Sequence, residues 1–421
     1  MKHNKRYDGM SLVQNRNGVH LLIVSANTSA RVSQIVDGLA NKGYDITLVN
    51  TSRSIIPTKV IKNFGVKSIS GSSTVKEVIV GGKGALFSRL PLLLRFLFSW
   101  PLVFISILRQ TQKTTLVIGV TPDLSSGLPA LICSKLFSKP FLLDYPDLMY
   151  YGDSVRPQCY LAALEKFQVK SADAISVVTN AWKEFILNEW KVQTRHIAVV
   201  SAAVEKGAID SMKREDHRAS LRMRLQLRET DFILGYAGGQ WYRKLPNRGM
   251  VDIQGVDSMI ASLVPLFQRY PNLHIVLAGA TNISNIGHQV HNLGPFTTGD
   301  SNHLDVLLGV DLLLLPSERC VTYQFFDRFK GFEYLASGTP VLAADMPPIR
   351  ETLGDRVQYY HVDDTQALQN GVVKFMERSL ATSVRYESLL TDNDTWDARV
   401  GVFESLISEL LGETDKFAIG L

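Results

Sequence analysis

One segment in the second half of the chain concentrates residue types that could hold a nucleotide. In residues 316–351, Asp327 stands just before a helix that the pattern places from near Arg328 onward. An aspartate at that place can cap the helix, whose first turn offers free backbone N–H groups and the positive end of a helix dipole. Lys330 falls in this first turn, and Glu333 follows three residues later on the same face. An exposed helical ion pair is the alternative interpretation of these two residues.

The chemistry of this arrangement suits a nucleoside diphosphate. A helix N-terminus that carries a lysine attracts phosphate groups. A carboxylate one turn deeper, here Glu333, can accept hydrogen bonds from two vicinal ribose hydroxyls. Gly338 then ends the helix and Pro340 begins the next strand, so the motif is bounded on its C-terminal side. The segment therefore predicts a donor-binding helix with roles for Asp327, Lys330 and Glu333.

Further polar and aromatic residues follow other expected strands. Asn27 lies on the exit loop of the first strand, where a phosphate of a donor or an acceptor would approach. Asp144 and Asp147 end a later strand and could hold or deprotonate an acceptor hydroxyl. Phe296 and Thr297 follow a Leu-Gly pair and could stack against a base or contact it through the backbone. Structural capping is the alternative for the Asn and Asp residues, and a place in the core is the alternative for the phenylalanine.

The elements that must position these residues alternate between strands and helices. Residues 19–24 form an apolar run, a helical pattern covers 32–42, and residues 45–49 form a second apolar run after a glycine. This order predicts a right-handed βαβ unit in a parallel sheet. The first half of the chain is therefore predicted to be a doubly wound α/β domain. Its later strands are predicted at 116–120, 140–143, 173–178 and 196–200.

The alternation begins again after a charged helix, predicted at 213–228. Later strands are predicted at 232–237, 273–278, 311–315 and 340–343. We therefore predict an α/β fold of two Rossmann-like doubly wound domains that face each other across a cleft, with the carboxyl ends of both sheets at its rims. The predicted parts are a disordered tail at 1–17, an N-terminal acceptor domain at 18–205, a C-terminal donor domain at 206–393, and a helix at 394–415 that packs back on the first domain.

The sequence Lys-Gly-Phe-Glu-Tyr-Leu-Ala-Ser-Gly-Thr-Pro-Val, residues 330–341, resembles the donor-site helix of retaining GT-B glycosyltransferases of the family 4 type. In that class the glutamate matching Glu333 binds the ribose of the nucleotide. The resemblance implies the GT-B fold, a nucleotide-sugar donor, metal-independent transfer and retention of the anomeric configuration. It also implies that Gly238 and Gly239 belong to the glycine turn that opens the donor domain. Other stretches resemble the same class in the same order along nearly the whole chain, at 117–147, 165–179, 235–239, 255–257 and 394–397.

The chain departs from the family pattern around this site. Phe325 occupies the position where the family commonly has a second glutamate. Gln240 and Gln254 occupy the positions of an arginine and a lysine that usually bind the diphosphate. Arg243 and Lys244 lie in the same predicted loop and could replace them, since a departing diphosphate needs cationic stabilisation. A solvent-exposed basic loop is the alternative for this pair.

Composition and charge limit the classes of function. The 421 residues are 45% hydrophobic and 20% charged, typical of a globular chain of two domains, and the net charge is +5. The basic residues at 213–228 have no interleaved aromatic residues, so nucleic-acid binding is not predicted. The three cysteines follow no metal-ligand spacing and indicate free thiols in a reducing compartment. No secretory signal precedes the first strand, so we expect a cytoplasmic protein. We also expect neither a metal site nor a cofactor.

Residues 85–108 are strongly apolar but are interrupted by arginines and prolines. The part without an arginine, residues 96–108, is shorter than the roughly 20 residues that a helix needs to cross a bilayer. One interpretation is an interfacial element at the inner face of a membrane, with Trp100 at the level of the headgroups. Buried helices of the N-terminal domain are the alternative, and the two interpretations are compatible.

These observations together predict a glycosyltransferase that moves a sugar from a nucleotide donor, a UDP-sugar first of all, to a glycan or lipid-linked acceptor in polysaccharide or glycoconjugate biosynthesis. Two alternatives stay open. Nucleotide-sugar 2-epimerases share the two-domain plan, and an epimerase needs only its nucleotide sugar. A catalytically inactive sugar-binding homologue is the other alternative, because of Phe325 and the two glutamines.

Overall fold

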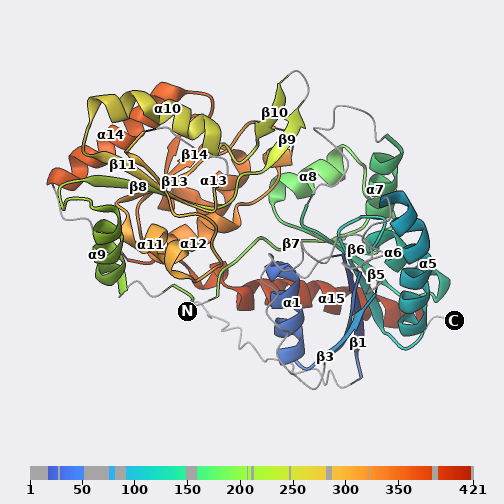
Figure 1. Ribbon diagram of the computed structural model, residues 1–421. Coiled ribbons are helices and arrows are strands. Elements are labelled where there is room, and N and C mark those ends of the chain that lie inside the picture. The colour runs from blue at the N-terminus through green and yellow to red at the C-terminus, as the bar shows by residue number, and fades with distance from the viewer. Residues whose placement is uncertain are drawn as a thin grey trace, which may run out of the picture.

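The computed structural model describes residues 18–26, 29–51, 75–80, 92–147, 159–205, 207–209, 213–245, 248–280, 287–320, 322–381 and 387–418. Within them, strands and helices form two α/β halves that lie side by side, the first at the right and the second at the left of Figure 1. The C-terminal helix, drawn in red, runs along the first half. The predicted tail at 1–17 lies outside the described residues.

The first half is built on a parallel sheet. Its strands in the described residues are β1 (His20–Ser25), β2 (Asp45–Asn50), β3 (Val75–Ile79), β4 (Leu116–Val120), β5 (Phe141–Tyr145), β6 (Ala174–Val177) and β7 (His196–Val199). Their order is β3-β2-β1-β4-β5-β6-β7, and all neighbours are parallel, as the βαβ order of the sequence requires. The strands β4 and β5 are buried along their whole length because helices cover both faces.

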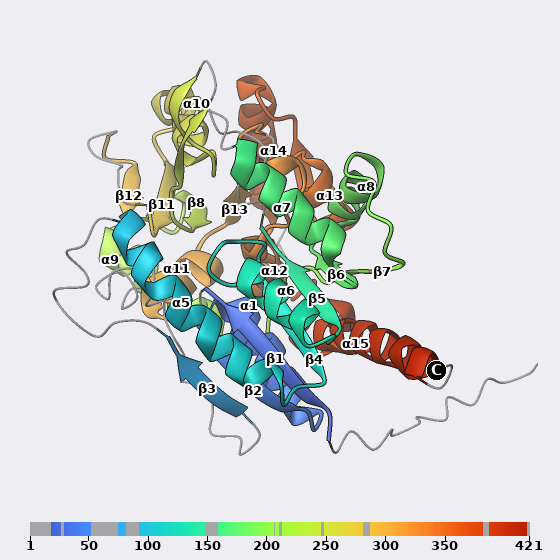
Figure 2. The same ribbon diagram turned by 90° about the vertical axis from the view of Figure 1, so that its right-hand side faces the viewer.

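Helices pack on both faces of this first sheet. One face is covered by α1 (Ala30–Asn41) and α15 (Trp396–Ala418), which share an apolar cluster that includes Leu39 and Phe403. The other face carries α5 (Leu92–Thr111), α6 (Gly127–Leu136), α7 (Cys159–Ser171) and α8 (Asn180–Asn188). Figure 2 shows α5, α6 and α7 together on that side. The C-terminal end of the chain thus contributes to the core of the first half.

The second half has its own parallel sheet. Its strands in the described residues are β8 (Phe232–Ala237), β11 (Leu273–Ala278), β12 (Val290–Asn292), β13 (Leu312–Leu315), β14 (Val341–Ala344) and β15 (Gln358–Tyr360), in the order β12-β11-β8-β13-β14-β15. The helices are α9 (Arg214–Leu225), α10 (Val256–Arg269), α11 (Ser301–Gly309), α12 (Phe329–Ser337), α13 (Pro347–Leu353) and α14 (Thr365–Ala381). In Figure 1, α10 and α14 cover one face, and α9, α11 and α12 lie on the other. Both halves are therefore Rossmann-like and doubly wound, as predicted.

Short and polar strands are the elements that the sequence pattern did not predict. The edge strands β3, β12 and β15 are mostly only partly buried, so they lack the continuous apolar run that marks a central strand. An antiparallel hairpin of β9 (Tyr242–Leu245) and β10 (Gly249–Asp252) stands where a loop was expected. It belongs to neither large sheet, and its polar residues gave no strand signal.

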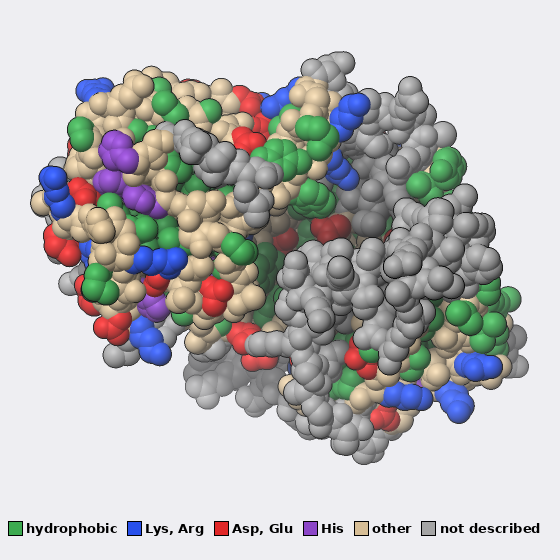
Figure 3. Space-filling model, viewed as in Figure 1, with side chains coloured by type: hydrophobic (Ala, Val, Ile, Leu, Met, Phe, Trp, Pro, Cys, Tyr) green, Lys and Arg blue, Asp and Glu red, His purple; other side chains and the backbone are tan. Residues whose placement is uncertain are grey.

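The two halves contact each other through helix α8 and two segments of the second half. The hydroxyl of Thr179 donates a hydrogen bond to the carbonyl of Phe325 at 2.5 Å. The ring of Trp182 meets that of Phe325 edge to face, with 5.0 Å between their centroids. The backbone N–H of Asn180 donates to the carboxylate of Glu351 at 2.6 Å. Figure 3 shows a hollow between the halves, with acidic side chains visible inside it.

Candidate functional site

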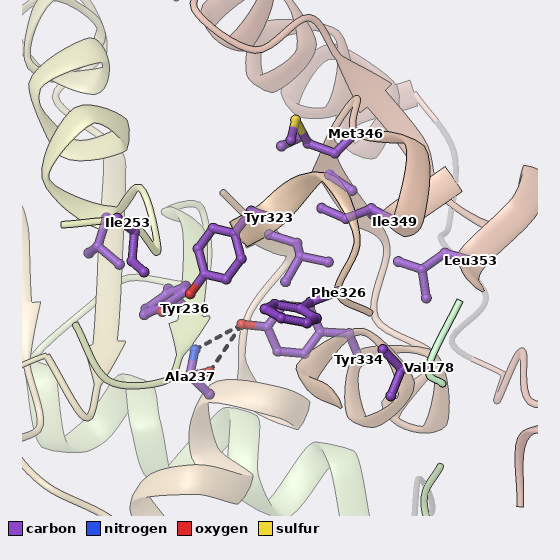
Figure 4. Packing of buried hydrophobic residues seen from close by; sticks show 14 of the residues in the cluster. Val178, Tyr236, Ala237, Ile253, Tyr323, Phe326, Tyr334, Met346, Ile349 and Leu353 are labelled. Carbon is purple, nitrogen blue, oxygen red and sulfur yellow. Dashed lines mark hydrogen bonds between the residues drawn. The ribbon is translucent and has the colours of Figure 1, made fainter. Parts of the chain in front are cut away.

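Helix α12 brings the residues of the predicted donor site to the carboxyl-terminal rim of the second sheet. It follows β13 and precedes β14, so its N-terminus lies where the parallel strands end. The hydroxyl of Tyr334 accepts a hydrogen bond from the backbone N–H of Ala237 at 3.0 Å, which attaches the helix to the end of β8 (Figure 4). Gly338 ends the helix at a φ of 71°, and a β-carbon there would lie 2.6 Å from the backbone of Glu387, so the position requires glycine.

Lys330 lies in the first turn of α12 and reaches the end of β8. Its Nζ donates a hydrogen bond to the hydroxyl of Tyr236 at 2.6 Å and another to Oε1 of Gln254 at 3.0 Å. Burial and the neighbouring Arg328 lower the pKa of Lys330 to about 7. These two bonds use two of the three N–H donors of an ammonium group, which leaves the third for an anionic ligand. A bound phosphate would also favour the charged form of this lysine.

Arg328 is a second cation at this helix tip, and the sequence interpretation gave it no role. Its guanidinium donates to Oε1 of Gln254 at 2.7 Å and to the hydroxyl of Ser317 at 2.7 Å, and it lies 3.6 Å above the ring of Tyr323. Gln254 accepts hydrogen bonds from both Arg328 and Lys330. The two cations therefore come from α12 and the residue before it.

Glu333 is buried one turn below these cations. It is 5% exposed, and its Oε2 lies 3.5 Å from Nε2 of His303 on α11. The ring of His303 is stacked on that of Phe296, with 4.8 Å between centroids and 5° between planes. The sequence predicted Phe296 and Glu333 for one site, and the structure brings them together through a histidine that was not predicted. His303 gave no signal because it stands in an otherwise ordinary helical pattern.

Gly238 and Gly239 follow β8 directly, beside the lysine of α12. A β-carbon on Gly238 would lie 2.5 Å from Nζ of Lys330, whereas a β-carbon on Gly239 would meet nothing within 4 Å. Gly279 ends the neighbouring strand β11, and a β-carbon there would lie 2.8 Å from the ring of Phe296. The glycine turn, the lysine and the aromatic stack thus line one continuous region at the ends of adjacent strands.

Asp327 does not cap α12, contrary to the prediction. The helix begins at Phe329, so its N-cap residue is Arg328, and that residue makes no side-chain cap. The carboxylate of Asp327 instead accepts a hydrogen bond from the backbone N–H of Ala202, in the segment that joins the two halves. Burial raises the pKa of Asp327 to about 6. Thr297, also a predicted site residue, is exposed, and its backbone N–H donates to Asp300 at 2.7 Å in the turn before α11.

Arg243 and Lys244 lie on strand β9 of the hairpin and not in a loop. Arg243 pairs opposite Val251, and Lys244 pairs opposite Met250. Neighbouring residues of a strand point to opposite sides, so the two cations cannot both face the cleft. The guanidinium of Arg243 lies 6.0 Å from the ring centroid of Trp241, while Lys244 is exposed.

The predicted residues of the first half lie at the carboxyl end of β5, as far as the structure describes them. Asp144 is 1% exposed and forms a bidentate ion pair with Arg31 of α1, at 2.8 and 3.0 Å. The hydroxyl of Ser176 also donates to its carboxylate. Asp147, just after the strand, is exposed. Asn27 lies outside the described residues. Asp144 is therefore engaged within the protein, whereas Asp147 is accessible.

The apolar segment predicted at 85–108 contributes most of helix α5. Its first part, residues 85–91, lies outside the described residues. Among the helices that the structure describes, none combines the length and the hydropathy that a membrane span requires. Leu102 and Ile105 nevertheless expose 56% and 42% of their surfaces on this helix.

Trp100 on α5 is fixed within the protein. It is half-buried, its indole N–H donates to the carbonyl of Leu124 at 3.0 Å, and its ring stacks on that of Phe104 with 5.5 Å between centroids. The interpretation that placed Trp100 among lipid headgroups is therefore not favoured by its hydrogen bond, which already satisfies the indole donor.

Cysteines and possible metal ligands also occur in the described part of the chain. Cys133 and Cys320 are buried and form no disulfide within the described residues. Within the described ranges, no group of three or more His, Cys, Asp or Glu side chains could hold a metal ion.

Comparisons with known proteins address the fold. No protein-family model matches the sequence, and no curated protein sequence matches it either. A sucrose-phosphate synthase from Thermosynechococcus elongatus matches with a TM-score of 0.63 at 15% identity, over 96% of this chain and 100% of that one. HepE from Anabaena, in complex with UDP-glucose, matches with a TM-score of 0.62 at 13% identity, over 92% of this chain and 99% of that one. A glycosyltransferase from Rickettsia africae matches with a TM-score of 0.60 at 14% identity, over 95% and 98%.

At these identities the likeness is one of fold. The matches extend over nearly the full length of each chain, so they include both halves and their arrangement. The protein has the GT-B fold, in which two Rossmann-like domains face each other across a cleft.

Proposed function

We propose that the protein is a glycosyltransferase that moves a sugar from a nucleoside-diphosphate donor to an acceptor. The observation that carries the proposal is the tip of α12, where Arg328 and Lys330 stand above the buried carboxylate of Glu333. The cations and the helix N-terminus suit a diphosphate, and the carboxylate suits ribose hydroxyls. One similar structure is a complex with UDP-glucose, and another is called a glycosyltransferase, which supports a UDP-sugar as the donor.

The proposed reaction breaks the bond between the anomeric carbon and the diphosphate, and an acceptor hydroxyl forms the new bond. Negative charge grows on the departing diphosphate, so Lys330 and the N-terminus of α12 stabilise it. Arg243 or Lys244 adds a cation from the hairpin. Asp147, accessible on the opposite rim, is the candidate to take the proton of the acceptor hydroxyl. Asp144 is a weaker candidate, because Arg31 already engages both of its oxygens.

The resemblance to family 4 enzymes extends this proposal to retention of the anomeric configuration and to transfer without a metal ion. The acceptor that we propose is a glycan or a lipid-linked molecule. Exposed apolar residues on α5 and α7, including Leu102 and Phe167, support a peripheral contact with a membrane that carries such an acceptor. Polysaccharide or glycoconjugate synthesis at the cytoplasmic face of a membrane is the corresponding cellular role.

The experiment that tests the activity follows nucleotide release from a panel of nucleotide sugars, with and without membrane extract. Release that depends on the extract is the expected result for a transferase. An altered sugar without release would indicate a 2-epimerase instead, and binding without any reaction would indicate an inactive homologue.

A matched pair of variants tests the site. Glu333→Ala removes the proposed acceptor of the ribose hydrogen bonds. Nucleotide affinity should therefore fall at least about tenfold, the loss expected when one or two hydrogen bonds to a charged group are removed. Glu377→Ala removes an exposed glutamate of α14 and should leave the affinity unchanged. Equal affinities in the two variants would refute the assignment of α12 as the donor site.

A further inference from the structure

His303 has an unusual position for a buried histidine. It is 1% exposed, in the first turn of α11. The backbone N–H of Gly299 donates a hydrogen bond to its Nδ1 at 3.1 Å. Since Nδ1 accepts this bond, the proton of the neutral ring lies on Nε2. That nitrogen is buried and has no hydrogen-bond partner among the described residues.

The carboxylate of Glu333 lies close to this nitrogen. Its Oε2 lies 3.5 Å from Nε2, slightly beyond a normal hydrogen bond. Glu333 is 5% exposed, and no described residue forms a hydrogen bond with its carboxylate. Buried polar groups in folded proteins are nearly always paired, so the unpaired Nε2 of His303 beside this carboxylate requires an explanation. A carboxylate in this state can accept hydrogen bonds from a ligand.

The surroundings of His303 prevent its ring from turning away. Phe296 lies flat against one face, 4.8 Å between centroids, and Phe296 itself contacts Gly279 at the end of β11. The Gly299 bond fixes the ring from the other nitrogen. The Nε2–H group is therefore held in one direction, toward Glu333.

We propose that His303 is a positioning residue that directs the Glu333 carboxylate toward the ribose of the bound nucleotide. This inference rests on the proposed function, because it assigns a partner to the ribose-binding carboxylate. The dipole of the Nε2–H group attracts one carboxylate oxygen, and the carboxylate then presents its remaining lone pairs to the ribose hydroxyls. The enzyme consequently distinguishes a ribonucleotide from a deoxyribonucleotide through the pair and not through Glu333 alone.

Two substitutions distinguish the roles of the two ring nitrogens, because each keeps a polar atom at the place of a different one. The amide nitrogen of glutamine reaches the place of Nε2, so His303→Gln keeps a donor toward Glu333. Asparagine reaches only the place of Nδ1, so His303→Asn keeps an acceptor for Gly299 but removes the group that faces Glu333. Both variants remove the ring that supports Phe296, so they differ chiefly in the donor toward Glu333.

The measurement is the calorimetric affinity for UDP and for 2′-deoxy-UDP in the wild-type protein, both His303 variants and Glu333→Ala. The ratio of the two affinities isolates the ribose contact, because losses in base stacking affect both nucleotides equally. We expect the wild type to prefer UDP by about tenfold, since a hydrogen bond to a charged group is lost in the deoxy compound. The preference should fall below about threefold in His303→Asn and vanish in Glu333→Ala, while His303→Gln keeps most of it.

Each outcome decides the proposal. If His303→Asn keeps the wild-type ratio of the affinities for UDP and 2′-deoxy-UDP, the role of His303 is overturned while the ribose contact of Glu333 stays intact. Equal losses in His303→Gln and His303→Asn would overturn it as well, because the donor would then be irrelevant. Failure of the wild-type protein to bind UDP would contradict the proposed donor itself, and the positioning role would fall with it.

Discussion

A β-carbon on Gly238 would lie 2.5 Å from the ammonium nitrogen of Lys330, so the glycine after β8 and the lysine of α12 share one space. The two residues belong to motifs that are distant in the sequence and adjacent at the rim of the second sheet. The glycine thus serves a purpose beyond backbone freedom, since its missing side chain is what lets Lys330 lie across the end of β8 and reach Tyr236.

Gly238→Ala should therefore displace Lys330 from its hydrogen bonds and weaken nucleotide binding. We expect a loss of about tenfold in UDP affinity, comparable with losing one charge-assisted hydrogen bond. The flexible end of the lysine can move aside, but Gly238 has a φ of 159°, so Gly238→Ala should also lower the melting temperature somewhat. Gly239→Ala is the matched comparison, because a β-carbon there meets nothing within 4 Å. Equal effects of both substitutions on affinity would contradict the role of the Gly238–Lys330 contact.

Nucleotide affinity should depend on pH through Lys330. Burial and Arg328 lower the pKa of this lysine to about 7, and a bound diphosphate raises it again because it favours the charged form. Affinity should thus be highest below about pH 7 and fall as the pH rises above that value, by at most about tenfold per unit. Titrations with UDP between about pH 6 and about pH 9 would measure this fall.

Lys330→Arg provides the control for this pH dependence. A guanidinium stays protonated over the whole range, so the fall in affinity above pH 7 should flatten. Titration of the nucleotide's own phosphate affects both proteins alike and cancels in the comparison. Parallel pH profiles for the two proteins would show that Lys330 does not titrate in the site.

The sequence predicted best those features that depend on neighbours along the chain. The central strands at 116–120, 232–237 and 273–278 occur where the apolar runs placed them, because a strand buried on both faces has a continuous signal. The place of Lys330 and Glu333 on one helix was predicted for a similar reason, since their spacing puts both on one face, and α12 contains both.

The features that the sequence did not predict depend on contacts between distant segments. His303 meets Glu333 only because α11 and α12 pack together, and no periodicity in either helix indicates that meeting. Asp144 was a candidate base from its place at a strand end, yet Arg31 from another element pairs with it. Asp327 was expected to cap a helix, and the helix begins one residue too late for that.

Asp327 should make the protein's stability depend on pH. Its carboxyl has a pKa of about 6 in the folded protein, raised from 3.8 by burial. The protonated carboxyl therefore stabilises the folded protein fully below pH 3.8, and this contribution is lost as the pH rises through 6. Asp327→Asn stays neutral and can still accept the hydrogen bond from Ala202. Its free energy of unfolding should therefore exceed that of the wild type above pH 6, by on the order of 1 kcal/mol after allowance for partial exposure.

Urea unfolding near pH 5 and near pH 8 would measure this difference. The advantage of Asp327→Asn should be larger at the higher pH. Asp45→Asn, at an exposed position of β2, is the control and should show no such trend. A variant that is less stable than the wild type at the higher pH would mean that the charged carboxylate stabilises the junction of the two halves.

Glu351 should contribute to the contact between the halves. From α13 its carboxylate accepts hydrogen bonds from the backbone N–H of Asn180 at 2.6 Å and of Ala181 at 3.4 Å, so it caps α8 of the other half. Glu351→Ala should lower the free energy of unfolding by about 1 kcal/mol, the usual effect of losing such a cap. Glu377→Ala, at an exposed position of α14, should change it by much less. Similar losses of unfolding free energy in the two variants would show that the cap between the halves does not stabilise the protein.

The exposed apolar side chains of α5 and α7 should bind anionic membranes if the acceptor is a lipid-linked molecule. Leu102 and Ile105 on α5 and Tyr160 and Phe167 on α7 are between 42% and 65% exposed, and α6 packs between the two helices. Partial burial of one such side chain in lipid contributes about 1 kcal/mol, so replacing Leu102 and Ile105 together by serine should reduce partitioning onto anionic vesicles by about tenfold or more. Met223→Ser is the matched control, because Met223 is 80% exposed on α9 of the other half. Sedimentation with vesicles of anionic and neutral lipid would measure the partitioning. Equal partitioning of the double variant and the wild type would exclude this face as the membrane contact, and the acceptor would then have to reach the cleft from solution.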